Sequence, residues 1–596
     1  KVSKKWIVLI FLAVFAGLYY YVFFTGQDYQ PMGDMAASNC LKYALGDETW
    51  CSYVQCGVPA VGSLLSAWRY NPICLIYNWI YPHDRSEYRW IAPFFLLAAL
   101  GVCAVLIRLE VPLAIGLICG LLYAFNPTML NYAGVGHGSK LMTIALLPWL
   151  LFFTDRLIVK RGVLSILLLA GCFWLQLVSL HVQIAYYGVM MVVFYCLWHS
   201  IKQKSVWPSV RVGMGLFIGV LLSAPLYTKV WEYSKLSVRS AGVGWDYATQ
   251  WSFHPLESIS YVLPGFFGFG GETYHGYMPF TYAPLYWGIA VLVFAVMAII
   301  WGKSRLKWFL VILAGLAWVM SFGKYLPILY APAYFILPIF DKFRAPMMIQ
   351  VLVLLPMVLL SGVGMKTVMK RFKSGWLVVV VAGVVGLAQF AVMGKRVVQP
   401  VSAQTMQEYL KPDSVVQFLQ QDSTIFRILP LVKHHNPNWY AVHHLESVLG
   451  QIGVSMANYQ AGMDSLFPSW EFLSLANVKY VITESPQESP YLEQVFLGDG
   501  QYVYLYNRHQ PRAFFYQGAG EVSWLEKSAD RNVLYVFTET ESLLFISQTY
   551  HPRWKAKMDG FNVPIEQVNG MFTGIIVPAG QHRIELEFNP WRSVDN

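Results

Sequence analysis

Long apolar stretches without a charged residue recur through the first 396 residues, and they constrain the fold more than any other feature. Apolar stretches of roughly 17–25 residues are typical of membrane-spanning helices. Only 13% of the residues are charged, too few to cover the surface of a soluble protein of this size. We therefore predict an α-helical polytopic membrane protein with about eleven spans. These spans are 6–24, 91–107, 111–126, 141–154, 163–180, 184–198, 212–227, 284–301, 308–322, 346–363 and 376–394.

Basic residues predict how the spans are oriented, because cytoplasmic loops carry the excess of Lys and Arg. With the N-terminus in the cytoplasm, the cytoplasmic segments carry 17 Lys and Arg against two acids, Glu110 and Asp155. Most of the net charge of +10 then lies at the cytoplasmic face. A nucleic-acid partner is not expected, since the sequence shows no soluble basic face with stacking aromatics. The cytoplasmic segments are 1–5, 108–110, 155–162, 199–211, 302–307 and 364–375.

The predicted spans contain no charged residue, and the ionisable groups collect in the external loops instead. Ion-coupled carriers usually place charged residues at mid-membrane, so a site at the external membrane boundary is favoured over a transport path. The first external loop, 25–90, is rich in acids, and we expect the chemistry there, at Asp34 first. Asp34 has an alternative role as the cap of the amphipathic helix that follows it. The other candidate acids are Asp28, Asp47 and Glu48.

Four of the eight cysteines also lie in this loop: Cys40, Cys51, Cys56 and Cys74. An external face permits disulfides, and four cysteines allow three pairings between which the sequence does not choose. No CxxC pair occurs, and Cys51 and Cys56 lack the spacing of a zinc knuckle. We expect the cysteines inside the spans to be packing residues.

After Lys395 the apolar spans stop, and residues 397–596 have the composition of a soluble domain. The count of spans places this domain outside the cytoplasm and leaves 1–396 as the transmembrane domain. Residues 397–500 mix helical and strand patterns, which predicts an α/β fold. Residues 501–596 consist of short runs separated by turn residues, such as the alternating RIELEF, and this is typical of a β-sandwich.

Five residues near the start of this domain form a local cluster: His434, His435, His443, His444 and Glu446. Two His–His pairs with a Glu have the residue types of a metal site. A solvated loop is the simpler interpretation, and we predict no metal ligand here.

Short motifs occur in a fixed order over nearly the whole chain. They are GDM at 33–35, CGVPAVG at 56–62, HVQ at 181–183, SFGKYLP at 321–327, FDKFRAP at 340–346, LANVKYVIT at 475–483, YHPRWKAKMDG at 550–560 and VPAGQHRIELEFNP at 577–590. Together they resemble the YfhO-like bacterial membrane proteins, a branch of the GT-C class of glycosyltransferases. Members of that family often continue into a further span. The sequence starts without Met and ends at Asn596, so we expect a trimmed product.

The resemblance implies an enzyme of the bacterial cytoplasmic (inner) membrane that takes a sugar from a polyprenyl-phosphate carrier. The acceptor on the external face would be an envelope glycan, lipid or protein. Related GT-C enzymes use an acid of the first external loop as the general base, and Asp34 occupies that place. No cofactor is certain, and a divalent metal stays open because several acids lie in the loop without tight ligand spacing. Two alternatives remain: a non-catalytic scaffold subunit of a membrane complex, and a lipid-linked glycan transporter.

The carrier phosphate needs cations near the outer headgroups, preferably Arg for bidentate contact. Each candidate has the alternative role of an interfacial anchor. The candidates are Arg344 first, then Lys140, Arg239 and Lys324. A His at the end of a span is commonly just a satisfied polar residue, but four outer-loop residues are candidates for substrate positioning. They are His137, His181, Gln183 and His254.

Overall fold

The computed structural model describes residues 3–24, 34–65, 67–81, 87–160, 162–398, 408–516 and 520–591, without the side chains of 34–36, 67–68 and 87–88. The chain divides into two compact units, which we name the membrane unit and the C-terminal unit. The membrane unit comprises Lys1–Met35, Arg69–Ala224 and Gly242–Met406. The C-terminal unit comprises Ala36–Trp68, Pro225–Ala241 and Gln407–Asn596.

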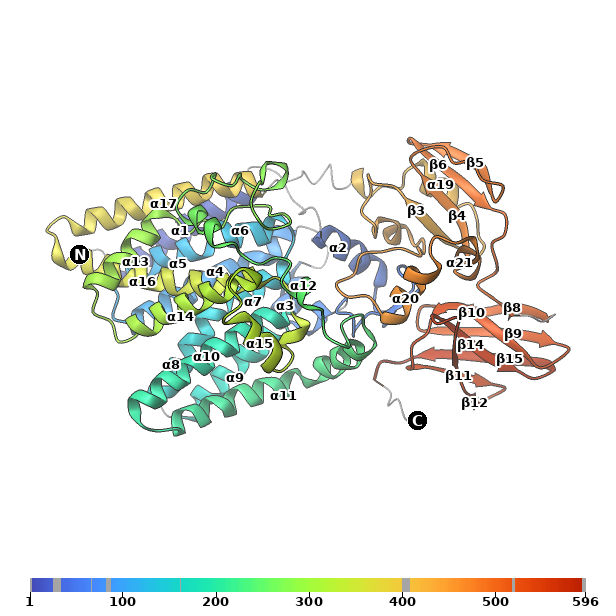
Figure 1. Cartoon of the computed structure of the whole chain (residues 1–596), viewed down its shortest axis with the longest axis horizontal. Coiled ribbons are helices and arrows are strands. Elements are labelled where there is room, and N and C mark those ends of the chain that lie inside the picture. The colour runs from blue at the N-terminus through green and yellow to red at the C-terminus, as the bar shows by residue number, and fades with distance from the viewer. Residues whose placement is uncertain are drawn as a thin grey trace. The chain divides into compact units, whose positions relative to one another are not determined.

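The membrane unit is a bundle of apolar helices joined by loops and 3-10 turns (Figure 1). Its α-helices are α1 (Lys4–Phe23), α3 (Pro72–Ile80), α4 (Glu87–Arg108), α5 (Leu113–Ala124), α6 (Pro127–Gly134), α7 (Gly138–Ala145), α8 (Leu147–Val159), α9 (Val163–Leu177), α10 (Val182–Gln203), α11 (Trp207–Leu236, which continues into the C-terminal unit), α12 (Trp245–Ala248), α13 (Ile289–Trp301), α14 (Lys307–Ser321), α15 (Tyr330–Ile336), α16 (Val351–Arg371) and α17 (Gly375–Val397). The 3-10 turns are η1 (Ala67–Tyr70, at the border of the units), η2 (Pro255–Tyr261), η3 (Gly271–Thr273), η4 (Gly323–Tyr325), η5 (Phe340–Lys342) and η6 (Pro346–Gln350).

An apolar helix coincides with every predicted span, so the chain is a polytopic helical membrane protein. Among the described residues, seven helices are long and apolar enough to cross a membrane. The pair α5 and α6, bent by 41°, makes an eighth if it is one span. The other three coinciding helices, α9, α13 and α14, are shorter, and the total of eleven therefore stays a prediction.

Small residues let these helices approach closely, as is usual where lipid gives no hydrophobic drive for association. A Cβ at Gly364 of α16 would lie 1.9 Å from the carbonyl oxygen of Phe294 in α13. A Cβ at Gly120 of α5 would lie 2.3 Å from the carbonyl oxygen of Ala99 in α4. At these two contacts only glycine allows the observed packing.

The C-terminal unit combines a mixed sheet with a two-sheet sandwich. The mixed sheet has the order β3-β4-β6-β5, with β3 and β4 parallel and the other pairs antiparallel. Its strands are β3 (Arg427–Leu431), β4 (Val478–Thr483), β5 (Leu492–Gly498) and β6 (Gln501–Tyr506). The helices of the unit are α2 (Asp34–Leu45, which starts in the membrane unit), α19 (Ser414–Leu419), η7 (Trp439–His443), α20 (Ala457–Leu466) and α21 (Trp470–Leu475).

The sandwich pairs a sheet of order β13-β14-β10-β7 with one of order β12-β11-β15-β9-β8, and side chains of both share one apolar core. Its strands are β7 (Ala513–Tyr516), β8 (Gly520–Lys527), β9 (Arg531–Thr538), β10 (Ser542–Thr549), β11 (Trp554–Met558), β12 (Phe561–Val563), β13 (Glu566–Val568), β14 (Phe572–Val577) and β15 (Gly580–Phe588). The predicted sandwich range, 501–596, also contains β6, which pairs instead with β4 and β5.

A hairpin from residues 25–90, the predicted first external loop, is built into the C-terminal unit. Its strands β1 (Trp50–Cys51) and β2 (Val58–Pro59) pair with each other. The backbone nitrogen of Trp50 donates to the Asp530 carboxylate at 2.7 Å, and its ring lies 4.9 Å from the ring of Phe588 in the sandwich core. The carbonyl oxygen of Cys56 accepts from the backbone nitrogen of Thr549 at 3.0 Å. This part of the loop is therefore a component of the C-terminal fold.

All eight cysteines lie in the described residues, and all are buried outside any disulfide. The disulfide that the sequence permitted among the four loop cysteines does not form. Cys40, Cys51 and Cys56 belong to the C-terminal unit, whereas Cys74 lies on α3 in the membrane unit. Burial raises the pKa of the Cys40 and Cys51 thiols to about 12, so these thiols are neutral at physiological pH.

Candidate functional site

The loop that carries Arg344 is held in place by backbone hydrogen bonds to the start of the long loop after α11. The nitrogen of Ala345 donates to the carbonyl oxygen of Ala248 at 3.0 Å, and that of Met347 donates to the carbonyl oxygen of Trp251 at 3.2 Å. Ala345 has φ 59°, a left-handed conformation that is strained for a residue with a Cβ. Strain of this kind persists where the surrounding structure imposes it, and it is enriched at functional sites.

The Arg344 guanidinium is half-buried between aromatic groups. Its carbon lies 5.5 Å from the ring centres of both Tyr247 and Trp251, and one amino group donates to the Tyr247 hydroxyl at 2.8 Å. Among the described residues no carboxylate forms an ion pair with it. An arginine has five N–H donors, so this guanidinium keeps donors for an incoming anion. The aromatic rings stabilise the cation without neutralising it.

Gln183 connects this arginine to the predicted histidine hairpin. Its side-chain nitrogen donates to the carbonyl oxygen of Arg344 at 2.7 Å and to the Tyr187 hydroxyl at 2.8 Å. Gln183 is buried at the start of α10, two residues after His181. Leu180, just before His181, has φ 75° and is a second left-handed, non-glycine residue beside a candidate side chain. Both ends of this contact are therefore conformationally restricted.

Lys140, His137 and His181 form a second polar group next to the first. The Lys140 ammonium donates to Nδ1 of His137 at 3.2 Å and lies 5.4 Å from the centre of the Tyr132 ring. Nδ1 of His181 accepts from the backbone nitrogen of Ile184 at 3.3 Å. Burial, with Lys140 and His137 as further contributions, holds the pKa of His181 well below its usual range. His181 is therefore neutral at pH 7, while Lys140 supplies positive charge.

Two further candidates, Lys324 and His254, lie close in sequence to residues that contact the Arg344 loop. The backbone nitrogen of Lys324 donates to the hydroxyl of Ser252 at 3.0 Å. A Cβ at Gly323, whose φ is 50°, would lie 2.7 Å from a ring carbon of Pro346, so this turn touches the Arg344 loop directly. His254 stacks on the ring of Tyr277 with 3.8 Å between ring centres.

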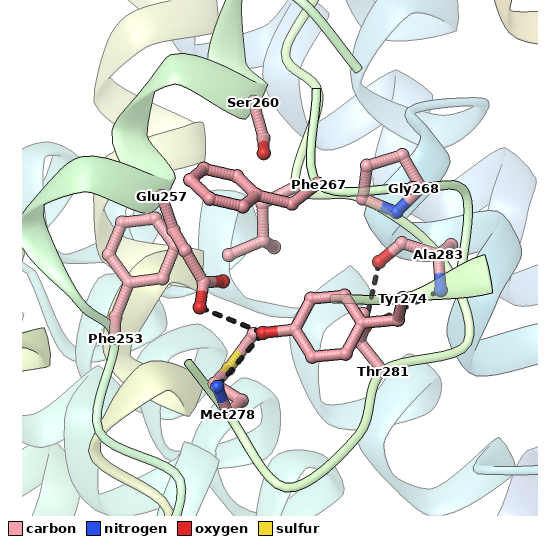
Figure 2. A pocket seen from close by; sticks show the side chains of 11 residues that line it. Phe253, Glu257, Ser260, Phe267, Gly268, Tyr274, Met278, Thr281 and Ala283 are labelled. Carbon is pink, nitrogen blue, oxygen red and sulfur yellow. Dashed lines mark hydrogen bonds between the residues drawn. The ribbon is translucent and has the colours of Figure 1, made fainter. Parts of the chain in front are cut away.

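A small cavity lies within the long loop after α11 and is lined by Glu257 and aromatic side chains of that loop (Figure 2). The buried Glu257 carboxylate accepts from the hydroxyl of Tyr274 and from the backbone nitrogen of Tyr277, each at 2.7 Å. The cavity measures about 10 Å³, which is room for at most one water molecule. Glu257 therefore holds the loop together, and the cavity is too small for a sugar.

Seven of the predicted site residues lie in the segments described above, and the structure does not add the other three to them. The seven, all in the membrane unit, are Arg344, Gln183, His181, His137, Lys140, Lys324 and His254. Asp28 lies outside the described residues. Asp34 is the first residue of α2, but its side chain is not described. Arg239 belongs to the C-terminal unit, so the structure does not add it to the group.

Sequence reasoning missed Tyr247 and Trp251, the two side chains that hold the Arg344 guanidinium. Both occur in a loop of a chain whose residues are 16% aromatic, so nothing local distinguished them from interfacial anchors. Only the pairing of residues 245–251 with 344–347 reveals their role.

The histidine cluster predicted in the C-terminal domain separates into two groups. Glu446 is buried among cations, with one oxygen 2.7 Å from Arg512 and the other 2.6 Å from Lys527. Burial alone would raise the pKa of Glu446, but these cations and Arg427 hold it well below its usual range. Glu446 is therefore engaged and is not a metal ligand. The histidines 434 and 435 instead meet Asp413.

Comparisons with known proteins agree with this architecture. The family described as bacterial membrane protein YfhO matches residues 523–592, which form most of the sandwich. Two cryo-EM classes of arabinofuranosyltransferase AftD from Mycobacteria share the fold over 99% of this chain, with a TM-score of 0.56 at 11% sequence identity. The sandwich of this chain therefore resembles the YfhO family, and the chain as a whole shares its fold with AftD.

This chain covers 60% of the length of the AftD chain. A crystal structure of ArnT from Cupriavidus metallidurans bound to undecaprenyl phosphate matches 84% of this chain and 98% of its own, at 13% identity and a TM-score of 0.49. No curated protein matches the sequence.

Proposed function

We propose that this protein is a membrane glycosyltransferase that moves a sugar from a polyprenyl-phosphate carrier to an envelope acceptor on the external face of the inner membrane. The observation that carries the proposal is the Arg344 guanidinium, half-buried against Tyr247 and Trp251 with no acidic partner in the described structure. A half-buried cation that has no ion-pair partner among the described residues favours an anionic ligand, and a planar guanidinium matches a phosphate bidentately. The GT-C fold that the chain shares with an arabinofuranosyltransferase supports the same reaction class.

The proposed reaction is a single displacement at the anomeric carbon of the sugar. The acceptor oxygen forms a bond to that carbon while the bond to the carrier phosphate oxygen breaks, which inverts the configuration. The hydroxyl proton passes to the Asp34 carboxylate, which acts as general base. The phosphate leaves with the electron pair of the broken bond, and Arg344 stabilises the charge that develops there.

The neighbouring residues have supporting roles in this proposal. Lys140 and Lys324 add positive charge that attracts the carrier phosphate. Neutral His181, with His137 and His254, positions hydroxyl groups by hydrogen bonds. Gln183 positions Arg344 through the carbonyl oxygen of that residue.

Sugar transfer from a labelled polyprenyl-phosphate donor, measured with the protein reconstituted in membranes, tests the proposal. Asp34→Asn is expected to lower kcat by about 10²–10⁴-fold with donor binding intact. Arg344→Lys keeps the charge but loses the planar fork, and we expect the donor KM to rise by about tenfold or more. Glu272→Gln, at an exposed acid of the long loop, serves as the control and keeps wild-type activity.

The outcomes separate the alternatives. Equal activity of Asp34→Asn and wild type would remove Asp34 as the base and leave Asp28 or Asp47. Absence of transfer by the wild type with several donors would favour the scaffold subunit. Carrier flux across liposomes without transfer would favour the lipid-linked glycan transporter.

A further inference from the structure

The C-terminal unit contains a group of side chains of the types that bind metal ions. The proposed transfer reaction does not use them. Asp413, His434 and His435 each offer one ligand atom, and these atoms all lie within 4.8 Å of one another. Among the described residues this is the one group of three side chains that offers such a set. We propose that Asp413, His434 and His435 bind a divalent transition-metal ion, with zinc as the best match.

The fold brings the three residues together at one end of the mixed sheet. β3 and β4 are parallel, so their carboxyl ends meet at the same edge. His434 and His435 follow β3, and Glu484 directly follows β4. Asp413 is the residue before α19, and Gln501 opens β6 at the same edge. The carboxyl ends of parallel strands are the usual place for binding sites in α/β sheets.

The distances suit a small tetrahedral ion. Nε2 of His435 lies 3.2 Å from Oδ2 of Asp413. Ligand atoms 2.0–2.2 Å from a tetrahedral zinc are about 3.4 Å apart, so these two atoms already stand at nearly the right separation. Two imidazoles and one carboxylate leave the fourth position to water, the arrangement of an open zinc site. A set of two nitrogens and one oxygen favours zinc over magnesium or calcium, which prefer oxygen ligands.

Neighbouring groups orient each ligand. Oδ1 of Asp413 accepts from the backbone nitrogen of Val416 at 2.7 Å, which turns Oδ2 toward His435. Oδ2 also accepts from the side chain of Gln501 at 2.9 Å. The His435 ring stacks on Trp439, with parallel planes and 3.7 Å between ring centres. The carboxylate and one imidazole are therefore fixed before any ion arrives.

His434 has the outer partner that metal-binding histidines usually have. Its Nδ1 lies 3.0 Å from Oε1 of Glu484, which leaves Nε2 for the ion. The same Glu484 oxygen accepts from the backbone nitrogen of Lys433 at 2.6 Å, so the carboxylate is itself anchored. Carboxylate–histidine pairs of this kind set the ring orientation and raise the basicity of the ligand.

Titration of the full chain with zinc tests the site. The protein is purified in detergent without a polyhistidine tag and stripped with a chelator, and binding is followed by calorimetry. We expect one zinc per chain. We also expect His435→Gln and His434→Gln to weaken binding by at least about 100-fold, and Glu484→Gln by about 10–100-fold. Asp413→Asn should weaken binding while keeping α19 capped, because Asn caps a helix as well as Asp does.

Cobalt binding gives a second measurement, the visible absorption of the bound ion. This absorption reports metal coordination directly and does not depend on the stability of the fold. Tetrahedral coordination by the wild type should produce visible absorption bands, and these bands should be lost in His435→Gln. His509→Gln, at the opposite end of β6, is the matched control and should bind both metals as the wild type does. The proposal is overturned if the wild type binds no zinc, or if His435→Gln and Asp413→Asn bind it as tightly as the control.

Discussion

Gln183 donates from its side-chain nitrogen to the backbone carbonyl oxygen of Arg344 at 2.7 Å, across 161 residues of sequence. Both residues belong to short motifs in predicted external loops, HVQ and FDKFRAP. The same nitrogen contacts the Tyr187 hydroxyl, so the amide is fixed from two sides. The bond anchors the loop that presents the guanidinium, and its loss should change substrate binding more than the chemical step.

Gln183→Met should therefore raise the donor KM by about tenfold with a smaller change in kcat, because one buried hydrogen bond to the Arg344 loop is lost. Steady-state transfer kinetics measure both constants. Gln176→Met is the matched control, since buried Gln176 donates to the carbonyl oxygen of Thr143 at 3.2 Å in the same unit. Equal KM effects in the two variants would show that general destabilisation is the cause.

Asp155→Asn should destabilise the membrane unit. The buried Asp155 carboxylate accepts from Arg108 and from the Tyr195 hydroxyl, and it lies 2.7 Å from Arg305, so it links α4, α8, α10 and the segment before α14. Removing one partner of a buried ion pair leaves uncompensated charge and costs about 3–5 kcal/mol. Thermal unfolding in detergent should show a clear fall in Tm.

The control for that experiment is Glu110→Gln. Glu110 lies 3.9 Å from Lys366, but its side chain is 92% exposed. Exposed ion pairs contribute little, so no measurable change in Tm is expected. A fall in Tm as large as that of Asp155→Asn would refute the assignment of stability to the buried cluster.

Ionisation of the Glu48 carboxyl should lower the stability of the C-terminal unit as pH rises. Burial first, and then the charge of Asp530, raises the pKa of its carboxyl from 4.5 to about 7. Between these values the folded protein holds a proton that the unfolded chain has released, so stability falls with rising pH across that window. Glu446 adds to the upward shift of the pKa and Lys527 opposes it.

Glu48→Gln should consequently stabilise the protein at pH 8 by roughly 1 kcal/mol and have no effect at pH 4. This free energy is smaller than the whole pKa shift of Glu48 would give, because the side chain is partly exposed and solvent screens its charge. Denaturant unfolding at pH 4, 6 and 8 measures the difference, with the exposed Glu539→Gln as control. A stabilisation that is the same at all three values would rule out the titration of Glu48 as its cause.

The cysteines should react with alkylating reagents only after unfolding, because all eight are buried and none forms a disulfide. Mass spectrometry after treatment without a reductant should show no modification of the native protein and eight adducts in denaturant. Six adducts in denaturant would instead reveal a disulfide and contradict the structure.

Features set by local physics were predictable from the sequence. An uncharged apolar run such as 346–363 partitions into a bilayer whatever surrounds it, and η6 and α16 together cover that run. Alternation in RIELEF predicts a strand with one buried face, and Ile584, Leu586 and Phe588 are indeed buried in β15. The loops between the predicted spans supply Gln183 and Arg344, which the structure shows in contact.

Only the tertiary structure decided which distant residues meet. The contact of Gln183 with Arg344, the entry of Trp50 into the sandwich core, and the pairing of His435 with Asp413 rather than Glu446 all depend on packing across long stretches of chain. Hydropathy and periodicity are properties of a segment, whereas burial, ion pairing and hydrogen-bond geometry belong to the folded whole. The spans and strands therefore follow from local sequence, and the candidate sites follow from tertiary contacts between residues that are distant in the sequence.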